Sequence, residues 1–437
     1  MTTRVLPFPI TFPRVTRNSL WAVWVLLLSI IPEGARVEIA GRTPKIQALD
    51  VVLALLVGVL LIKTFFSDEF YFGFEDRSVL YAFSAFIFAN FLSLAMSVND
   101  PLRSAITIKT FLVGYLSYVV VLSCVDRKHV GSVALCLGIT GACVSALLSY
   151  SFFTSDWHEQ AIASVTDAVH LKTSVETTVG HSNYIAALLV IIIPIVFAFA
   201  VSAKGRLRWL LFLLGLLNVF GLVNTLSRGA AASLLGGIVL AIPYLHRAGV
   251  RLKHYFIALL AAGVGVLFLP SSLLQVNVVL IAARLQNPTG SRLDLFNVAW
   301  HTFLQHPIVG VGPGCIYIYI SQYAYDSIQR HAHNLLVNSL AEVGIVGTIP
   351  LVIFLGIIFY RSREFVLLSL KSRRNVAISL GLFISLTATL GHCMVEPTFL
   401  GVQYSALFWT LAAIIYLLHK KAVSDSRTTP ATPEADR

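Results

Sequence analysis

The sequence contains little charge and few cysteines. Asp, Glu, Lys and Arg make up 12% of its 437 residues, whereas hydrophobic residues make up 57%. Soluble domains carry about 25% charged residues, so this composition excludes that class and indicates a polytopic membrane protein. The five cysteines are an odd number without CxxC spacing, so neither a disulfide framework nor a thiolate metal site follows. No repeat of fixed period is visible, which argues against a repeat array.

The chain contains many long apolar runs, and its mean hydropathy is +0.81. A run of about 17 to 24 residues is long enough for a helix to cross the roughly 30 Å hydrocarbon core. About twelve spans are predicted, near residues 19–32, 46–66, 79–98, 104–124, 130–153, 181–201, 207–224, 229–245, 254–270, 336–360, 375–395 and 399–418. The predicted fold is an all-α polytopic membrane protein, with the first span the weakest. Residues 1–32 have the basic start of a signal peptide, but the spans that follow favour an uncleaved first helix.

Lys and Arg residues predict the orientation of these spans. With the N-terminus inside, they are roughly twice as frequent in the segments placed in the cytoplasm as outside. We therefore expect a cytoplasmic N-terminus at 1–18, a single transmembrane domain at 19–420 and a disordered cytoplasmic tail at 421–437. The acidic loop 66–78 fits the rule poorly, which leaves a miscount among the early spans open.

Two predicted outer loops, at about 154–180 and 271–335, exceed the usual connection length. The second is long enough to carry short helices that lie on the membrane. Loops of this kind commonly carry function, so the site is sought there. The net charge of +11 does not indicate nucleic acid, because the basic residues are spread over short inner loops that face anionic lipid.

Arg228 lies in the first turn of a predicted span, after Ser227 and before Gly229. A cation there opposes the helix dipole, so helix stability does not explain it. One interpretation is an arginine that reaches lipid headgroups. The other is a phosphate held jointly by the guanidinium and the helix N-terminus.

Asn334 is a good N-cap for the span that begins at Leu335, which places His333 just before a helix N-terminus. The positive end of the helix favours a neutral imidazole, which can accept a proton. A histidine merely bonded at a helix entry is the alternative. His331 and His333 also form an HxH pair that could bind a metal, although no third ligand is obvious.

Other polar or aromatic groups accompany this pair. The run Gly310-Val-Gly-Pro-Gly314 lacks GxGxxG spacing and predicts a tight turn. His181 and Asn183, at the outer start of a span, are either polar site residues or a cap with a core hydrogen bond. Four tyrosines could stack on sugar rings or belong to an interfacial aromatic belt. These are Tyr317, Tyr319, Tyr323 and Tyr325.

Five motifs follow one another along the chain: Gly180-His-x-Asn183, Leu226-Ser-Arg-Gly-Ala230, Arg292 with Trp300, His306-Pro-Ile-x-Gly-Val-Gly-Pro-Gly314, and His333-Asn334 running into Ala341-Glu-Val-Gly344-Ile-Val-Gly347. As an ordered set, they resemble the O-antigen ligase and polymerase superfamily. The resemblance covers about 180–350 in motifs and the whole chain in topology. It does not separate a ligase from a polymerase.

The resemblance implies a GT-C-like glycosyltransferase whose active site faces the periplasm at the inner membrane of a Gram-negative bacterium. The donor is a glycan on undecaprenyl diphosphate, and no nucleotide sugar is used. In a ligase the acceptor is a sugar hydroxyl of lipid A-core; in a polymerase it is another lipid-linked repeat. The resemblance further implies no metal or other cofactor, and a base at His333.

The chemistry of the residues agrees with that expectation. Transfer from a glycosyl diphosphate needs a base for the acceptor proton and positive charge for the departing diphosphate. We expect His333 to be the base, in a single displacement with inversion. Arg228 and Arg292 are expected to hold the diphosphate, with His331 or Lys109 assisting.

Some assignments stay open. His181 and Asn183 are further candidates for substrate binding, and Arg284 competes for the place of the second phosphate-binding arginine. His331 competes with His333 for the role of base. A repeat polymerase or a protein O-oligosaccharyltransferase is the nearest rival function. A transporter of lipid-linked glycans is less favoured, because the charged residues, apart from Glu342 and Glu396, gather at the outer boundary and do not follow the spans towards the midplane.

Overall fold

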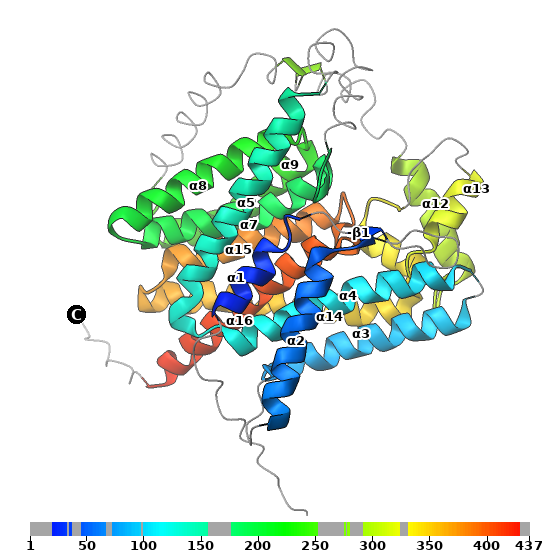
Figure 1. Cartoon of the computed structure of the whole chain (residues 1–437), viewed down its shortest axis with the longest axis horizontal. Coiled ribbons are helices and arrows are strands. Elements are labelled where there is room, and N and C mark those ends of the chain that lie inside the picture. The colour runs from blue at the N-terminus through cyan, green and yellow to red at the C-terminus, as the bar shows by residue number, and fades with distance from the viewer. Residues whose placement is uncertain are drawn as a thin grey trace, which may run out of the picture.

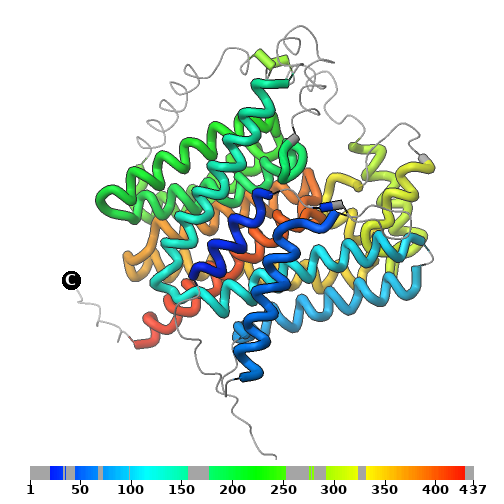
Figure 2. Tube along the Cα trace, in the orientation of Figure 1, coloured from blue at the N-terminus to red at the C-terminus, as the bar shows by residue number. Residues whose placement is uncertain are grey.

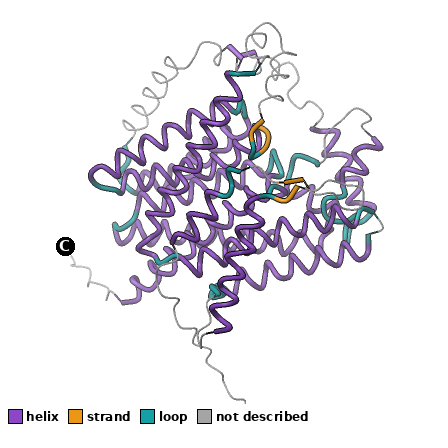
Figure 3. Tube along the Cα trace, viewed as in Figure 1, coloured by secondary structure: helices purple, strands orange, loops and turns teal. Residues whose placement is uncertain are grey.

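The computed structural model describes residues 20–32, 35–36, 45–66, 72–97, 99–155, 176–251, 275–276, 278–279, 292–323 and 331–428. These residues form a helical bundle, with two short antiparallel ladders at its edge (Figure 3). The ladders pair β1 (Ala35–Arg36) with β2 (Lys45–Ile46), and β3 (Glu176–Thr177) with β4 (Gly180–His181). The predicted all-α fold class is therefore confirmed.

The longer helices agree closely with the apolar runs of the sequence (Figure 1). They are α2 (Ala48–Phe66), α3 (Arg77–Met96), α4 (Pro101–Cys124), α5 (Val130–Phe153), α7 (Ser182–Ser202), α8 (Gly205–Asn224), α9 (Arg228–Arg247), α14 (Leu335–Ser372), α15 (Val376–Cys393) and α16 (Val402–Thr428). Among the described residues, these 10 helices are long and apolar enough to cross a membrane. The chain is a multi-pass membrane protein.

Two of the predicted spans are not among these helices. The first is represented by α1, which covers only Leu20–Leu28 and is too short to cross the hydrocarbon core as a helix. The span predicted at 254–270 lies outside the described residues. At the other end of the chain, α16 continues to Thr428, beyond the boundary predicted at residue 420.

Helices from distant parts of the sequence pack side by side in the bundle. The early helices α3 and α4 contact the late helices α14 and α16, respectively, as the blue-to-red colouring of Figure 2 makes visible. Buried aromatic rings fill this contact: Phe83 stacks on Tyr115, with ring centroids 4.5 Å apart, and meets Trp409 edge-on at 5.0 Å. Such pairs add about 0.5–1.5 kcal/mol each beyond area burial. They fix α3, α4 and α16 against one another.

The bundle has two distinct ends. Helices α7, α9 and α14 begin at one end, which we call the site end. Helices α3 and α5 begin at the other, which we call the opposite end. There, buried Asp76 pairs with Arg361 of α14 and accepts a 2.6 Å hydrogen bond from the Tyr118 hydroxyl. Removing one partner of such a buried pair is strongly destabilising, because it leaves an uncompensated charge.

Two short helices cover the site end: α12 (Arg292–Gln305) and α13 (Ile316–Tyr323). Their apolar faces form a cluster with the first turns of α14 that is separate from the main core. Leu295, Ala299, Ile316, Ile320, Ala332, Val337 and Ala341 make up its buried part. The predicted short helices within the long loop 271–335 are thus present, and their packing holds the start of α14 in place.

A glycine-rich turn joins α12 to α13 and enters a break in α14. Gly310, Gly312 and Gly314 have φ values of 68°, 107° and 72°, a region that favours glycine. Within α14, Gly344 is non-helical, with φ 59° and ψ −164°. The turn and the break exchange backbone hydrogen bonds, including Gly312 N to the carbonyl oxygen of Glu342 at 3.0 Å. The predicted tight turn is confirmed, and it satisfies backbone groups that the broken helix leaves unpaired.

Candidate active site

His333 is placed by the residue that caps α14. The Asn334 side-chain oxygen accepts hydrogen bonds from the backbone N–H groups of Leu336 and Val337, at 3.0 and 3.1 Å. The side-chain amide of Asn334 also donates to the carbonyl oxygen of Met394 at 3.2 Å. The predicted N-cap is therefore confirmed. His333 itself has a φ of 51°, a left-handed conformation that is uncommon for a side chain of this size and is often found at functional sites.

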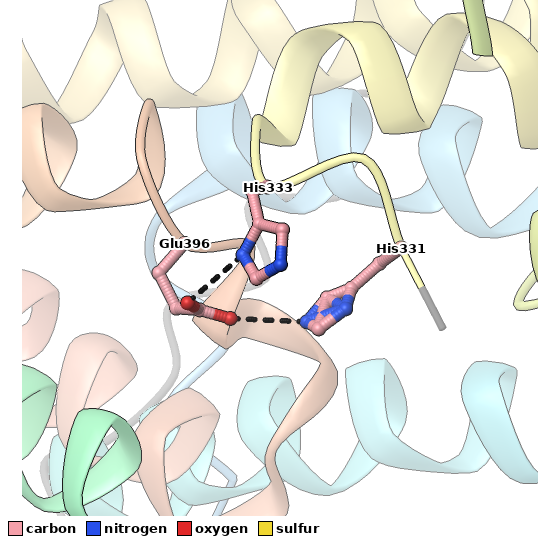
Figure 4. A group of neighbouring side chains, drawn as sticks. All are labelled: His331, His333 and Glu396. Carbon is pink, nitrogen blue, oxygen red and sulfur yellow. Dashed lines mark hydrogen bonds and ion pairs between the residues drawn. The ribbon is translucent and has the colours of Figure 1, made fainter. Parts of the chain in front are cut away.

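Glu396 joins the two histidines of the HxH pair. It is buried in the turn after α15, and each of its carboxylate oxygens contacts a different imidazole (Figure 4). Oε2 lies 3.0 Å from Nδ1 of His333, and Oε1 lies 3.0 Å from Nε2 of His331. The side-chain amide of Asn183 donates to the same Oε2 at 3.4 Å. The carboxylate thus lies at the centre of a polar cluster contributed by α7, the α14 entry and the α15 exit.

The charge state of Glu396 determines the tautomers of its partners. Burial raises the pKa of its carboxyl, but the hydrogen bond from His333 and the interactions with His333, His331 and His181 outweigh burial and hold the pKa at about 2. An ionised carboxylate only accepts hydrogen bonds, so Nδ1 of His333 and Nε2 of His331 both carry hydrogen. In that tautomer, it is the Nε2 atom of His333 that carries the lone pair.

His331 is held neutral beside this carboxylate. Burial lowers its pKa to about 4, and the nearby His333 and Arg103 lower it as well, although Glu396 acts in the opposite direction. The rings of His331 and His333 lie 4.8 Å apart at an angle of 31°. A neutral imidazole at this position donates a hydrogen bond to Glu396 without adding a cation next to His333.

A cavity of about 250 Å³ adjoins the cluster and contains both predicted phosphate-binding arginines. We call it the arginine cavity; it is lined by Asn183, Ser227, Arg228, Gly229, Ala232, Arg292, His392, Val395 and Glu396. Glu396 and Asn183 belong to both the cavity wall and the histidine cluster. Glu396 therefore contacts His333 and also lines the cavity that contains the two arginines.

Four helix N-termini surround this site. Arg228 and Arg292 are the first residues of α9 and α12, and Asn183 lies in the first turn of α7. His333 comes directly before the N-cap of α14. Each N-terminus adds a partial positive charge, so the site is suited to a multiply charged anion.

Other predicted residues lie apart from the cluster or outside the description. Lys109 pairs with Asp50, at 2.7 Å from Nζ to Oδ2, and is not part of the cavity lining. His181 lies edge-on to Tyr184, with ring centroids 4.6 Å apart, and contributes to the potential at Glu396. Arg284 lies outside the described residues.

Of the four tyrosines, two have described contacts and two have side chains that lie outside the description. The Tyr317 hydroxyl donates to Asp100 at 2.8 Å, and Tyr319 lies near the His306 ring. The side chain of Tyr323 and all of Tyr325 lie outside the description.

Glu396 and His392 were not expected from the sequence. Glu396 is a carboxylate between two strongly apolar spans, and an ionisable residue in such a place suggests a functional role by itself. The sequence could not supply its partners, because His333 is 63 residues away. His392 is buried near the end of α15 and lines the arginine cavity, with no comparable signal in the sequence.

The same cluster supplies three groups of the kinds that bind metals. One donor atom from each of His331, His333 and Glu396 lies within 4.8 Å of the others. However, the two imidazole nitrogens contact different carboxylate oxygens at 3.0 Å, which is an ordinary hydrogen-bond distance. The arrangement is explained by hydrogen bonding, and a chelator provides the direct test.

Comparison with known proteins relates part of the chain to one family. No curated protein matches the chain. One family model does match, that of O-Antigen ligase, over residues 213–352. The matched segment includes Arg228, Arg292, His331 and His333, four residues of the site just described. Members of this family transfer lipid-linked glycans. Residues 213–352 are therefore similar to the O-Antigen ligase family.

Proposed function

We propose that this protein is an O-antigen ligase. It transfers a glycan from undecaprenyl diphosphate to a sugar hydroxyl of lipid A-core, with inversion at the anomeric carbon. The observation that carries this proposal is that Glu396 contacts His333 and lines the same cavity as the two arginines. A glycosyl diphosphate needs positive charge and a base within one substrate's reach, and the site supplies both.

The arginine cavity receives the diphosphate. Guanidinium groups match phosphate oxygens with two parallel hydrogen bonds, and Arg228 and Arg292 both line the cavity. The N-termini of α9 and α12 add to the positive potential. As the anomeric C–O bond breaks, its electron pair leaves on the diphosphate, and these groups stabilise the developing charge.

His333 takes the proton from the hydroxyl group of the acceptor sugar. The Glu396 carboxylate accepts a hydrogen bond from Nδ1–H of His333. Nε2 of His333 then removes the proton from the sugar hydroxyl as the hydroxyl oxygen attacks the anomeric carbon. The new C–O bond forms on the face opposite the departing diphosphate, which inverts the configuration. The resulting imidazolium is stabilised by the Glu396 carboxylate beside it. His331 and Asn183 hold that carboxylate in place through its two oxygens.

The distribution of charge supports a periplasmic position for this site. Lys and Arg are concentrated at the opposite end of the bundle, which the positive-inside tendency places in the cytoplasm. They include Arg77, Arg127, Lys128, Lys204, Arg206, Arg208, Arg247, Lys371, Arg373 and Arg374. Lipid-linked glycan and lipid A-core then meet at the outer surface of a bacterial inner membrane.

Reconstitution tests the proposed function directly. The purified protein is combined with a polyprenyl-diphosphate glycan, with and without lipid A-core and with EDTA throughout, and the products are separated by size and mass. We expect glycan on lipid A-core only when that acceptor is supplied, and no loss of activity with EDTA. Lengthened polyprenyl-linked glycan without an acceptor would identify a polymerase instead. Loss with EDTA and recovery with zinc would assign the histidine cluster to a metal.

A further inference from the structure

A large cavity lies at the opposite end of the bundle, far along the helices from the arginine cavity. Its volume is about 1030 Å³, at the upper limit of the roughly 300–1,000 Å³ range of ligand pockets. We call it the opposite-end cavity. The starts of α3 and α5 and the ends of α4, α7 and α16 form its walls. None of the groups proposed for glycan transfer lines it.

Part of the wall of this cavity is apolar. Phe72 and Phe74 line one side, stacked with ring centroids 5.7 Å apart. Phe199 of α7, Leu211 of α8 and Leu417 of α16 supply further apolar surface. A free inorganic anion gains nothing from such walls, whereas hydrocarbon attached to a headgroup is removed from water there.

Cations outnumber carboxylates around the same space. Five basic residues line the cavity, namely Arg77, Arg127, Lys128, Lys420 and Lys421, against two carboxylates, Glu75 and Asp126. Lys420 pairs with Glu75. None of the ion pairs found between described residues involves Arg127, Lys128 or Lys421. The residues that line the cavity therefore carry a net positive charge, which favours binding of an anion.

We propose that the opposite-end cavity binds an anionic phospholipid from the leaflet at that end of the bundle. The headgroup phosphate contacts Arg127, Lys128 and Lys421, and the glycerol and upper acyl chains lie against the phenylalanine and leucine walls. Basic pockets between membrane helices on the cytoplasmic side are suited to such headgroups. The bound lipid bridges α4, α5 and α16 and stabilises the bundle by mass action. This site is independent of the transfer reaction.

Thermal unfolding in detergent tests the proposal. The full chain is titrated with dioleoylphosphatidylglycerol, and in parallel with dioleoylphosphatidylcholine, glycerol 3-phosphate and inorganic phosphate. We expect a rise in Tm that saturates only with the anionic lipid. An equal rise in Tm with phosphatidylcholine would show that the negative charge of the headgroup is not required, which would overturn the proposal. A full rise with either free phosphate would overturn the lipid as the ligand.

Variants that remove positive charge test whether phosphatidylglycerol binds in the opposite-end cavity. Arg127→Gln combined with Lys128→Gln is expected to weaken the apparent affinity for phosphatidylglycerol about 25-fold, since each cation near a membrane surface contributes roughly fivefold. The matched control is Lys371→Gln with Arg374→Gln, two exposed cations at the same end that do not line the cavity. The same affinity for the wild type and the cavity variant would overturn the proposal.

A third variant fills part of the opposite-end cavity and leaves the charge of its lining unchanged. Gly131 lines the cavity, and a Cβ there would meet only Phe199, at an ordinary 3.9 Å. Gly131→Phe is expected to fold, to keep its glycan-transfer activity and to lose the saturable response to phosphatidylglycerol. An unchanged response in this variant would place the lipid elsewhere.

Discussion

Glu396 Oε2 lies 3.0 Å from Nδ1 of His333, and the same side chain forms part of the wall of the arginine cavity. One carboxylate therefore holds the proposed base and borders the space proposed for the leaving group. Its negative charge favours an imidazolium on His333 during the reaction. It also requires strong positive charge beyond it, because an anion would otherwise repel a diphosphate. Arg228 and Arg292 supply that charge.

Replacing Glu396 by Gln tests the first role. The amide keeps the shape of the side chain but loses the charge that stabilises the imidazolium and sets the His333 tautomer. We expect kcat to fall by roughly 10²- to 10⁴-fold with little change in KM. The transfer assay with purified, folded variant provides the measurement.

A second Glu–His pair provides the control for that change. Glu364 Oε2 contacts Nε2 of His419 at 2.8 Å, at the opposite end of the bundle. Glu364→Gln should leave kcat unchanged. If both variants lost activity equally, the effect of Glu396→Gln would be structural.

The two histidines are expected to differ in their effects on activity. His333→Ala removes the proposed base and should abolish transfer, a loss of roughly 10³-fold or more, while the protein remains folded. His331→Gln keeps a donor for Glu396 Oε1 and should retain most activity. Single-turnover rates with pre-bound donor distinguish chemistry from binding. Wild-type rates in the His333→Ala variant would remove the base assignment, and a greater loss in His331→Gln would transfer it to His331.

Arg228→Lys tests the requirement for a guanidinium. Lysine keeps the charge but loses the paired hydrogen-bond donors that match a diphosphate. We expect kcat/KM to fall by roughly 10- to 10³-fold. Arg206→Lys, at the start of α8 on the opposite end, is the matched control and should have no effect. Normal kinetics in both variants would mean that Arg228 acts only as a headgroup contact.

The pH dependence of stability follows from the buried His331. Its pKa is about 4 in the folded protein against an ordinary value of 6.5, so the folded state binds fewer protons between these values. Stability is full above pH 6.5 and decreases as the pH falls towards 4, by on the order of 3 kcal/mol. The fall in Tm from pH 6.5 to 4.5 should therefore be smaller in His331→Gln than in the wild type. Parallel curves for the two proteins would show that His331 titrates normally.

The sequence predicts those features that depend on local chain length and local chemistry. The spans from α2 to α9 and from α14 to α16 follow from apolar runs, and the cap at Asn334 follows from its place before such a run. The contact between Glu396 and His333 could not be predicted from local sequence, because it depends on how α7, α14 and α15 pack. Lys109 was predicted to assist from near the outer end of its span, whereas packing pairs it with Asp50, a contact that the sequence did not indicate.

The glycine turn provides a prediction about folding rather than chemistry. Gly310 has a φ of 68°, and a Cβ there would lie 2.3 Å from the Glu342 carbonyl carbon, which is backbone and cannot move aside. Gly310→Ala should therefore destabilise the protein by roughly 1–3 kcal/mol through strain and displacement of the turn from α14.

Gly356→Ala is the matched control for this change. Gly356 lies in a helical part of α14, and an added Cβ would meet nothing within 4 Å. Alanine there should preserve or raise the Tm, because it favours the helix by up to about 1 kcal/mol. The Tm of both variants in the same detergent provides the measurement. If Gly310→Ala melted at the wild-type temperature, the turn would not be holding the broken helix. A lower Tm in Gly310→Ala alone would show that the backbone contacts between the turn and the break at Gly344 stabilise the helix whose first residues position His333.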